Sequence, residues 1–128
     1  MEIKQINLKD IPSEIIVEGR RNRLIFRDSD NATYFGGFIK DELVCLTCLV
    51  IYSGGTAAIK SNFTVKEHRG KGYFTELNKY TLKYVWGHGV KSITLNCLKD
   101  SVGIHLKQGA RIWKTTKTIF WLVYDGKH

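Results

Sequence analysis

The sequence lacks several features that would place it in particular classes of protein. No stretch approaches the 18 consecutive apolar residues of a membrane-spanning helix, and residues 1–4 lack the basic-then-apolar pattern of a secretory signal. The three cysteines are an odd number, which argues against a disulfide framework and for a reducing compartment. Internal repeats, low-complexity tracts and linkers are also absent. We therefore expect residues 1–128 to form one globular, cytoplasmic domain.

Acidic side chains are scarce relative to basic ones. Twelve Asp and Glu residues stand against twenty Lys and Arg residues, which gives a net charge of +8. This excess favours acidic or polyanionic partners and permits nucleic acid as one of them. The densest basic cluster contains Arg20, Arg21, Arg23 and Arg27. It is interpreted either as a solvated helix face or as a surface that recognises an acidic partner.

A second pair of metal ligands is missing beside the Cys-x-x-Cys formed by Cys45 and Cys48. The two cysteines lie inside the apolar run 43–51. Cysteine in such a run is usually a buried thiol, and a structural zinc site needs four ligands. We therefore predict free buried thiols and no metal site.

The most informative stretch that is present runs from Val65 to Leu77. Apolar, β-branched residues at 57–59 and 63–65 predict a strand before it, and helical spacing of apolar residues predicts a helix after it. The apolar residues of that helix are Tyr73, Leu77, Tyr80 and Tyr84. Between strand and helix lies a basic loop with Gly70 and Gly72.

This order of strand, glycine-containing loop and helix favours the binding of an anion. The first amides of a helix have no intrahelical partner and lie at the positive end of its dipole. Glycine also lets a phosphate approach the backbone closely. The loop lacks the Walker A pattern and the third glycine of a dinucleotide fingerprint. It therefore predicts a pyrophosphate site, with a simple surface turn as the alternative.

The remaining patterns predict a mixed α/β (α+β) fold. Expected strands span residues 1–6, 34–39, 43–52, 57–65, 91–98, 111–116 and 118–124, and expected helices span 13–26, 73–87 and 100–107. Residues 40–42 form the turn of a hairpin, and glycines at 87, 89 and 109 end helices. Asp100 or Ser101 is expected to cap the last helix. The strands at 57–65 and 91–98, joined by a helix, form a parallel β-α-β unit.

The segment Arg69-Gly70-Lys71-Gly72-Tyr73-Phe74 resembles motif A of the GNAT (GCN5-related N-acetyltransferase) superfamily, whose pattern is Gln/Arg-x-x-Gly-x-Gly/Ala. Residues 104–110, with His105, Lys107 and Gly109, resemble its motif B. The resemblance covers about residues 33–126. It implies a mostly antiparallel central sheet of six or seven strands, in which the two parallel strands splay around a CoA cleft. It also implies acetyl-CoA as the cofactor, and no metal.

The resemblance further implies which residues bind the cofactor. In that family the loop amides bind the pyrophosphate, and the preceding strand pairs with the pantetheine arm and polarises the thioester carbonyl. A bulge at residues 63–65 would leave a backbone amide unpaired within the sheet, and that amide could polarise the carbonyl. The predicted cofactor-binding residues are Phe63, Thr64, Val65, Arg69, Gly70, Lys71, Gly72, Tyr73, Phe74, Ser101 and Lys107.

Three residues are candidates for catalysis. His105 occupies the place of the motif B tyrosine, the frequent general acid of the family, and imidazole exchanges protons near neutral pH. Its alternative role is that of a helix-surface or cleft-lining histidine. Tyr73 and Asn96 are the other candidates, and Tyr80 is a further substitute.

A general base is missing from the strand where many family members carry a glutamate. Residues 57–65 contain no carboxylate, and Lys60, Ser61 and Asn62 fill its polar positions. The base could come from elsewhere, water could relay the proton, or the acceptor could have a low pKa. The residues considered within reach are Glu67, Glu76, His68 and Asp100.

The sequence therefore leads to three hypotheses. The first is an acetyl-CoA-dependent N-acyltransferase acting on an amine, with an acidic protein or a nucleic acid favoured as acceptor. A phage-type DNA base modifier similar to Mom is the sharpest form of this hypothesis. The second is an inactive GNAT-fold module that binds CoA or nucleic acid. The third is plain nucleic-acid binding through aromatic strands and the basic face. The sequence predicts no membrane association and leaves the oligomeric state open.

Overall fold

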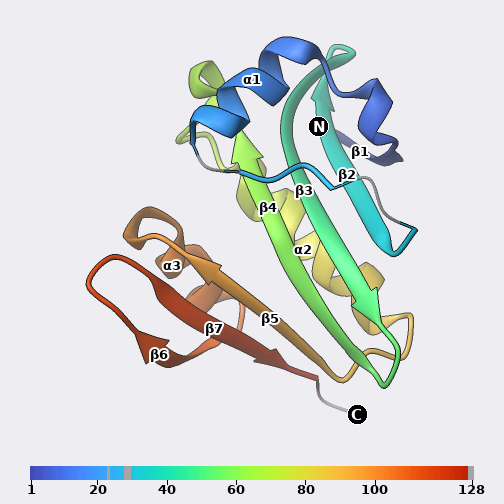
Figure 1. The fold of residues 1–128 in the computed structure, drawn as a ribbon. Helices are drawn as coiled ribbons and strands as arrows, with labels where there is room; N and C mark the ends of the chain where they lie inside the picture. Colours follow the sequence, from blue (N-terminus) through green and yellow to red (C-terminus); the bar gives the residue numbers. More distant parts are fainter. Residues whose placement is uncertain (23, 28–29, 127–128) are drawn as a thin grey trace.

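The computed structural model describes residues 1–22, 24–27 and 30–126. Seven strands form one sheet in the order β1-β2-β3-β4-β5-β7-β6 (Figure 1). The strands are β1 (Glu2–Ile6), β2 (Ala32–Ile39), β3 (Glu42–Tyr52), β4 (Thr56–Thr64), β5 (Ser92–Cys97), β6 (Arg111–Thr115) and β7 (Phe120–Asp125). The helices are α1 (Ser13–Arg21), α2 (Tyr73–Trp86) and α3 (Lys99–Lys107), with short 3-10 turns at Leu8–Asp10 and Lys66–His68. The predicted mixed, mostly antiparallel sheet is confirmed.

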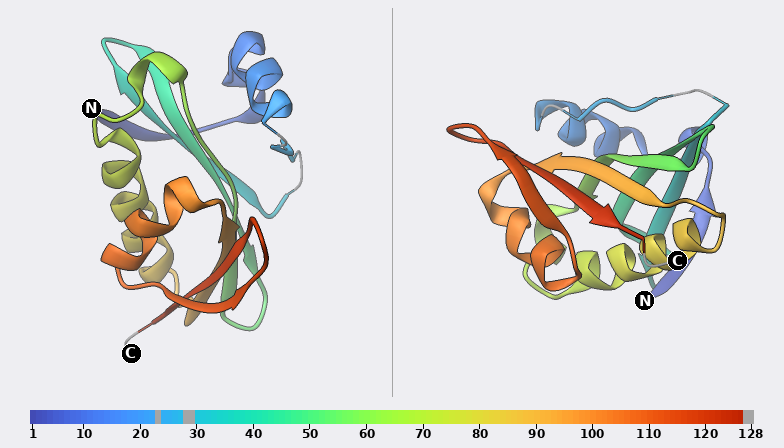
Figure 2. Two further views of the ribbon diagram at one scale, coloured as in Figure 1. Left: turned by 90° about the vertical axis from the view of Figure 1, so that its left-hand side faces the viewer. Right: turned by 90° about the horizontal axis from the view of Figure 1, so that it is seen from below.

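Helices cover the two faces of this sheet. We call the face under α1 the front face and the face under α2 and α3 the back face (Figure 2). The back cluster includes Leu49, Leu77 and Ile93, and the front cluster includes Ile15 and Leu46. Strand β3 supplies side chains to both clusters and is buried from residue 43 to residue 50. That double burial explains why its sequence is apolar on both faces.

The sheet opens where its two parallel strands meet. Strands β4 and β5 pair only over residues 56–58 and 92–94, although β4 continues to Thr64 and β5 to Cys97. Beyond that point β4 stays with β3, and β5 stays with β7. The divergence is visible between β4 and β5 in Figure 1. The predicted splay of the β-α-β unit is therefore confirmed.

The first helix is shorter than predicted. It ends at Arg21 rather than at residue 26, and the Leu24 N–H bonds back to the Gly19 carbonyl at 3.0 Å. Gly19 lies inside the helix, where a Cβ would be 2.6 Å from Cζ of Phe26. The absent side chain thus lets Phe26 fold back against α1. Arg23 of the predicted basic cluster lies outside the described residues, as do residues 28 and 29 of the polar loop after it.

Several details of the other two helices were predicted wrongly. Helix α3 begins at Lys99 with Leu98 at the N-cap, so Asp100 and Ser101 lie inside its first turn and do not cap it. Helix α2 ends at Trp86, and of the two glycines predicted to end it Gly89 has the left-handed backbone. The buried face of α2 is formed by Leu77, Asn78, Thr81, Leu82 and Val85. Tyr80 is 40% exposed, and its ring contacts Phe35 edge-to-face at the border of the core.

Cys45 and Cys48 are free and buried, as predicted, and Cys97 is free and half-buried. Cys45 belongs to the back cluster and Cys48 to the front cluster, because residues three apart on a strand point to opposite faces. The two thiols therefore cannot bind one ion together. Among the described helices, none combines the length and apolar character needed to cross a bilayer.

Candidate active site

The loop after β4 presents an open backbone surface. Gly70 and Gly72 have φ angles of +77° and +82°, and a Cβ at either position would meet no atom within 4 Å. Glycine is therefore needed here for the left-handed backbone and not to avoid a neighbour inside the protein. Lys71 between them is exposed. Among the residues that the structure describes, no atom occupies the space next to these two glycines.

The helix that follows leaves its first amides free of helical bonds. The first intrahelical bond runs from the Glu76 N–H to the Gly72 carbonyl at 3.2 Å. The N–H groups of Tyr73, Phe74 and Thr75 precede that bond, and no side chain caps the helix. The positive end of a 14-residue helix thus meets the glycine loop. This geometry suits an anion such as a pyrophosphate.

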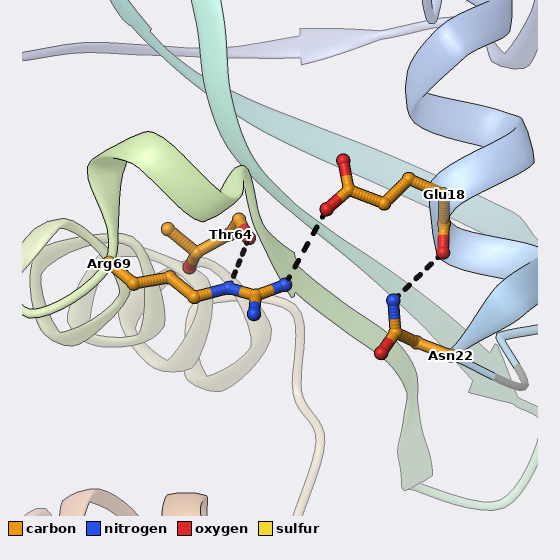
Figure 3. Close-up of polar contacts among 4 residues, drawn as sticks. All are labelled: Glu18, Asn22, Thr64 and Arg69. Carbon is orange, nitrogen blue, oxygen red and sulfur yellow. Dashed lines mark hydrogen bonds and ion pairs between the residues drawn. The ribbon is translucent and has the colours of Figure 1, made fainter.

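Arg69 turns away from that loop toward α1. Its Nε donates to the Thr64 carbonyl at 3.0 Å, and its Nη2 lies 3.9 Å from Oε1 of Glu18 on α1 (Figure 3). Its guanidinium carbon also lies 5.7 Å from the centre of the Phe63 ring. The Phe63 side chain is buried in the front cluster. Arg69 therefore joins the end of β4 to α1.

The free edge of β4 offers one of the three amides that were predicted to bind the cofactor. The Val65 N–H is already bonded to the Val44 carbonyl at 2.8 Å. Because an antiparallel ladder alternates, the N–H of Phe63 points toward β3 too, whereas those of Thr64 and Asn62 point away from it. That direction is toward the gap left by β5. Of the three predicted amides, only that of Thr64 lies on the free edge. The Asn62 amide also lies there, although the sequence did not indicate it.

The expected bulge lies at a different position. It falls at Lys60 and not at residues 63–65, because Cys48 pairs with Ser61 while Leu49 pairs with Ile59. Lys60 is therefore the extra residue of β4. It is exposed and lies just beyond the last pair of β4 with β5. The run of polar residues 60–62 does not by itself indicate a bulge, because the register between β3 and β4 determines its position.

His105 lies in the interior, 0% exposed. Its Nδ1 is 2.5 Å from the Tyr124 hydroxyl, which accepts a bond from Nδ2 of Asn78 at 3.1 Å. Asn78 also donates to Oε1 of Gln108 at 2.7 Å, and Nε2 of Gln108 donates to the Thr75 carbonyl. Because the Tyr124 hydroxyl accepts from Asn78, it can donate its own hydrogen to Nδ1 of His105. Nδ1 is then the acceptor, and the neutral imidazole carries its hydrogen on Nε2. That Nε2 has no hydrogen-bond partner among the described residues.

Burial determines the protonation of this network. It lowers the pKa of His105 from 6.5 to about 4 and raises the pKa of Tyr124 to about 12. His105 is therefore neutral at pH 7. Its ring packs edge-on against Phe74, the motif A residue at the start of α2. The network of Thr75, Asn78, His105, Gln108 and Tyr124 joins α2, α3 and β7.

The other predicted site residues are dispersed. Asn96 is exposed on the part of β5 that has separated from β4, and Tyr73 is half-buried beside His68. Ser101 lies in the first turn of α3, where its N–H bonds to the Leu98 carbonyl. Lys107 ends α3 and lines a depression beside Lys79 and Lys83 of α2, away from the glycine loop.

Comparison with known proteins agrees with this geometry. Residues 3–110 match the model of the acetyltransferase (GNAT) family. The fold is similar to that of the ribosomal-protein-S18-alanine N-acetyltransferase from Escherichia coli, with a TM-score of 0.81 and 9% identity over 97% of this chain and 92% of that one. It is also similar to the IAA acetyltransferase from Bacillus cereus, with a TM-score of 0.79 and 12% identity over 98% and 99% of the two chains.

An acetyltransferase from Bacillus subtilis, solved in complex with CoA, has a TM-score of 0.73 and 15% identity over 98% of each chain. No curated protein sequence matches this chain significantly. The identities are low, so the structural likenesses show the fold alone. The family match is independent of them and covers most of the chain, including the glycine loop. This protein belongs to the GNAT acetyltransferase family.

Proposed function

We propose that this protein transfers an acetyl group from acetyl-CoA to an amine by direct attack. The observation that carries the proposal is the open glycine loop at the unpaired start of α2, next to the edge of β4 that β5 leaves free. Backbone amides on two adjoining elements thus face the same gap. They suit a ligand with a pyrophosphate and an amide-containing arm, which acetyl-CoA has.

Each part of the gap is assigned to one part of the cofactor. The amides of residues 70–75 hold the pyrophosphate, with the exposed Lys71 as a nearby cation. The edge amides of Asn62 and Thr64 pair with the pantetheine arm and orient the thioester carbonyl. Arg69 contributes by fixing the Thr64 carbonyl, and hence the end of β4.

When bound, acetyl-CoA supplies an activated acetyl group, whose carbonyl carbon bonds to the amine nitrogen while the sulfur leaves as a thiol. The chain's own residues must hold the amine as the neutral form. A buried, neutral His105 is a poor source of the thiol's proton, and its bonds indicate a structural role. The exposed Asn96 on the diverging part of β5 is the polar side chain that we assign to the reaction centre.

The acceptor is proposed to be acidic or macromolecular. The net charge of +8 supports this, and a polycationic acceptor would be repelled. Protein and nucleic-acid acceptors both fit that description. A second candidate function is a catalytically inactive module that binds CoA, and the burial of His105, in place of an accessible motif B acid, favours it.

Calorimetry with acetyl-CoA tests the proposal. The variant Gly72→Glu places bulk and negative charge in the loop, and repulsion of a phosphate at contact distance should weaken binding roughly a hundredfold or more. Gly54→Glu is the matched control, because Gly54 also has a positive φ of +91° and open space around it, but lies in the β3–β4 turn. We expect micromolar binding by the wild type and by Gly54→Glu.

The outcome separates the two candidate functions. Binding that Gly72→Glu abolishes, together with thiol release in the presence of an amine, supports the transferase. Binding without thiol release for any amine supports the inactive module. No binding by the wild type would overturn both.

A further inference from the structure

The front face of β5, β7 and β6 has an aromatic surface that none of the described helices covers (Figure 1 and Figure 2). Trp113 of β6 is 55% exposed, and Trp121 of β7 is half-buried beside it. Their ring centres lie 6.2 Å apart. Single exposed apolar side chains need no explanation, but contiguous ones mark binding surfaces. We call Trp113, Trp121 and the neighbouring Lys114 the tryptophan surface.

The alternation of side chains along the strands places this surface beside the gap between β4 and β5. Leu122 of β7 and Leu95 of β5 belong to the back cluster, so Trp121 and Asn96 point to the front face. These two residues are direct partners in the antiparallel pair, which puts their Cβ atoms about 4.5–5.5 Å apart. Asn96 lies on the part of β5 that has separated from β4. The tryptophan surface therefore begins one strand away from the gap.

A bulge in β6 brings two consecutive side chains against Trp121. The register of β6 shifts between Ile112 and Lys114, so Trp113 is the extra residue. In a regular strand, Trp113 and Lys114 would point to opposite faces. Here the Trp113 ring contacts the Trp121 ring, and Nζ of Lys114 lies 5.4 Å from the centre of the Trp121 ring. The pairing of β6 with β7 thus assembles all three side chains on one face.

The Trp121 indole has a donor that the protein does not use. Its Nε1 is buried and has no hydrogen-bond partner among the described residues. A buried donor without an acceptor is uncommon and destabilises the protein. The side chain that lies over the same ring belongs to the exposed Lys114. A ligand bound on this surface can therefore offer the indole N–H an acceptor atom.

The charges around the surface restrict which ligands it suits. Lys114 and Lys117 are exposed and form no ion pair within the described part of the chain, whereas Arg111 is paired with Asp125. A polynucleotide is bound through a longer basic track than two lysines provide. The same lysines disfavour an acceptor with a second ammonium group. A single amine attached to an aromatic ring fits both the charge and the shape of this surface.

Resting on the transfer function proposed above, we propose that Trp113 and Trp121 bind an aromatic ring of the acceptor and thereby select aromatic amino acids or peptides that begin with one. The two acceptors share the ring and the α-amine. A ring stacked on Trp121 places that amine, a few bonds away, beside Asn96 at the edge of the gap. The acetyl group is then transferred to this amine, and the thiol leaves as described above.

Acceptors that differ only in the saturation of the ring test this selection. Phenylalanine is compared with cyclohexylalanine, each supplied free and as the first residue of an otherwise identical short peptide. Thiol release is measured for the wild type, Trp121→Leu, Trp113→Leu and the control Tyr52→Leu. Tyr52 is 42% exposed on β3, three strands away from β7.

The aromatic acceptor should be preferred in at least one of the two forms, and that form identifies the source of the ring. We expect its kcat/KM to exceed that of the saturated acceptor roughly fivefold to tenfold, the size of one ring-stacking contact. Trp121→Leu should bring this ratio toward one, and Trp113→Leu should lower it. Tyr52→Leu should leave the ratio unchanged, and the acetyl-CoA Kd should stay the same in all three variants.

A second measurement does not depend on turnover. The chain has three tryptophans, so the labelled protein gives three indole N–H signals in a nuclear magnetic resonance spectrum. Trp86 of α2 packs on the back cluster and serves as the internal control. N-acetylphenylalanine, the product of the reaction, should shift the signals of Trp113 and Trp121 and leave that of Trp86 in place. N-acetylcyclohexylalanine should shift them less at the same concentration.

The outcomes separate this selection from the transfer function. Selective shifts of the two signals without acetyl-CoA binding would keep the surface and refute the transfer function. Acetyl-CoA binding with equal kcat/KM for both acceptors, or an equal ratio in Trp121→Leu and the wild type, would overturn the selection. It would also be overturned if neither signal shifted, if only an oligonucleotide shifted them, or if the shifts followed protein concentration because a second copy covers the surface.

Discussion

The loop after β4 and the front face beneath α1 differ in how their conformation is determined. The loop presents backbone amides from consecutive residues, 70–75, whose direction follows from two glycines and a helix start. On the front face, distant strands hold residues 24–27: the Ser61 hydroxyl donates to the Ile25 carbonyl, and the Tyr34 hydroxyl bonds to the backbone of Arg27. The loop is therefore encoded locally, whereas the front-face segment depends on long-range pairing.

A third region, the buried network around His105, would also have to be considered if it took part in the chemistry. The pH dependence of stability tests whether His105 has a structural role instead. Its folded pKa of about 4 lies below its usual 6.5, so the unfolded state binds more protons between these values. The stability that His105 contributes is then fully present above pH 6.5 and is lost as the pH falls toward 4. Between pH 7 and pH 4.5 the wild type should lose about 2–3 kcal/mol more than His105→Asn.

Urea unfolding of both proteins at the two pH values measures this difference. Acetyl transfer by His105→Asn at pH 7 supplies the second readout, and we expect a kcat within about threefold of the wild type, less than removal of a general acid costs. A loss of kcat by two or more orders of magnitude with unchanged stability would place His105 in the chemistry instead.

The front face can be disturbed while the loop is left intact. Gly19→Ala would push against the Phe26 ring, at 2.6 Å from its Cζ, and should destabilise the protein by about 1–3 kcal/mol. Gly103→Ala is the matched control in α3, where a Cβ meets no atom within 4 Å, and should stabilise by about 0.5–1 kcal/mol. In thermal unfolding, Gly19→Ala should lower the Tm and Gly103→Ala should raise it.

The same pair separates the two regions in function. Gly19→Ala should leave the acetyl-CoA Kd within about twofold, because Phe26 packs on the front cluster and not on the loop. Weaker acetyl-CoA binding in Gly19→Ala would mean that the front face and the loop are not independent.

Arg69 gives the smallest effect, because it connects both regions through exposed contacts. Its pair with Glu18 is half exposed and 3.9 Å long, so solvent should limit the coupling energy to about 0.5 kcal/mol or less in a double-mutant cycle. Its bond to the Thr64 carbonyl is shorter, at 3.0 Å. Arg69→Gln should therefore weaken acetyl-CoA binding more than Glu18→Gln does. Equal effects of both variants on acetyl-CoA binding would mean that Arg69 acts through its ion pair with Glu18 and not through its bond to the Thr64 carbonyl.

Features encoded by neighbouring residues could be predicted from the sequence. The glycine loop, the hairpin turn at Lys40 and Asp41, and the parallel β-α-β unit all follow from local patterns. Features that depend on distant contacts could not. Gly19 makes room for Phe26, and no local pattern reveals that contact.

The same division applies to the candidate site. The bulge lies at Lys60 and not at residues 63–65, because the register between β3 and β4 determines its position. The Val65 amide is not available to a ligand, because it bonds to the Val44 carbonyl. His105 bonds to Tyr124 of β7, which in turn bonds to Asn78 of α2, so its burial could not be inferred from the motif. The sequence thus located the loop, whereas the bulge and the surroundings of His105 required the tertiary structure.

Hydrogen exchange with and without acetyl-CoA tests the central claim most directly. If the loop and the β4 edge bind the cofactor, acetyl-CoA will slow exchange in residues 62–75 and leave residues 24–27 unchanged. Protection confined instead to the depression between α2 and α3, beside Lys79, Lys83 and Lys107, or no protection at all, would contradict the account.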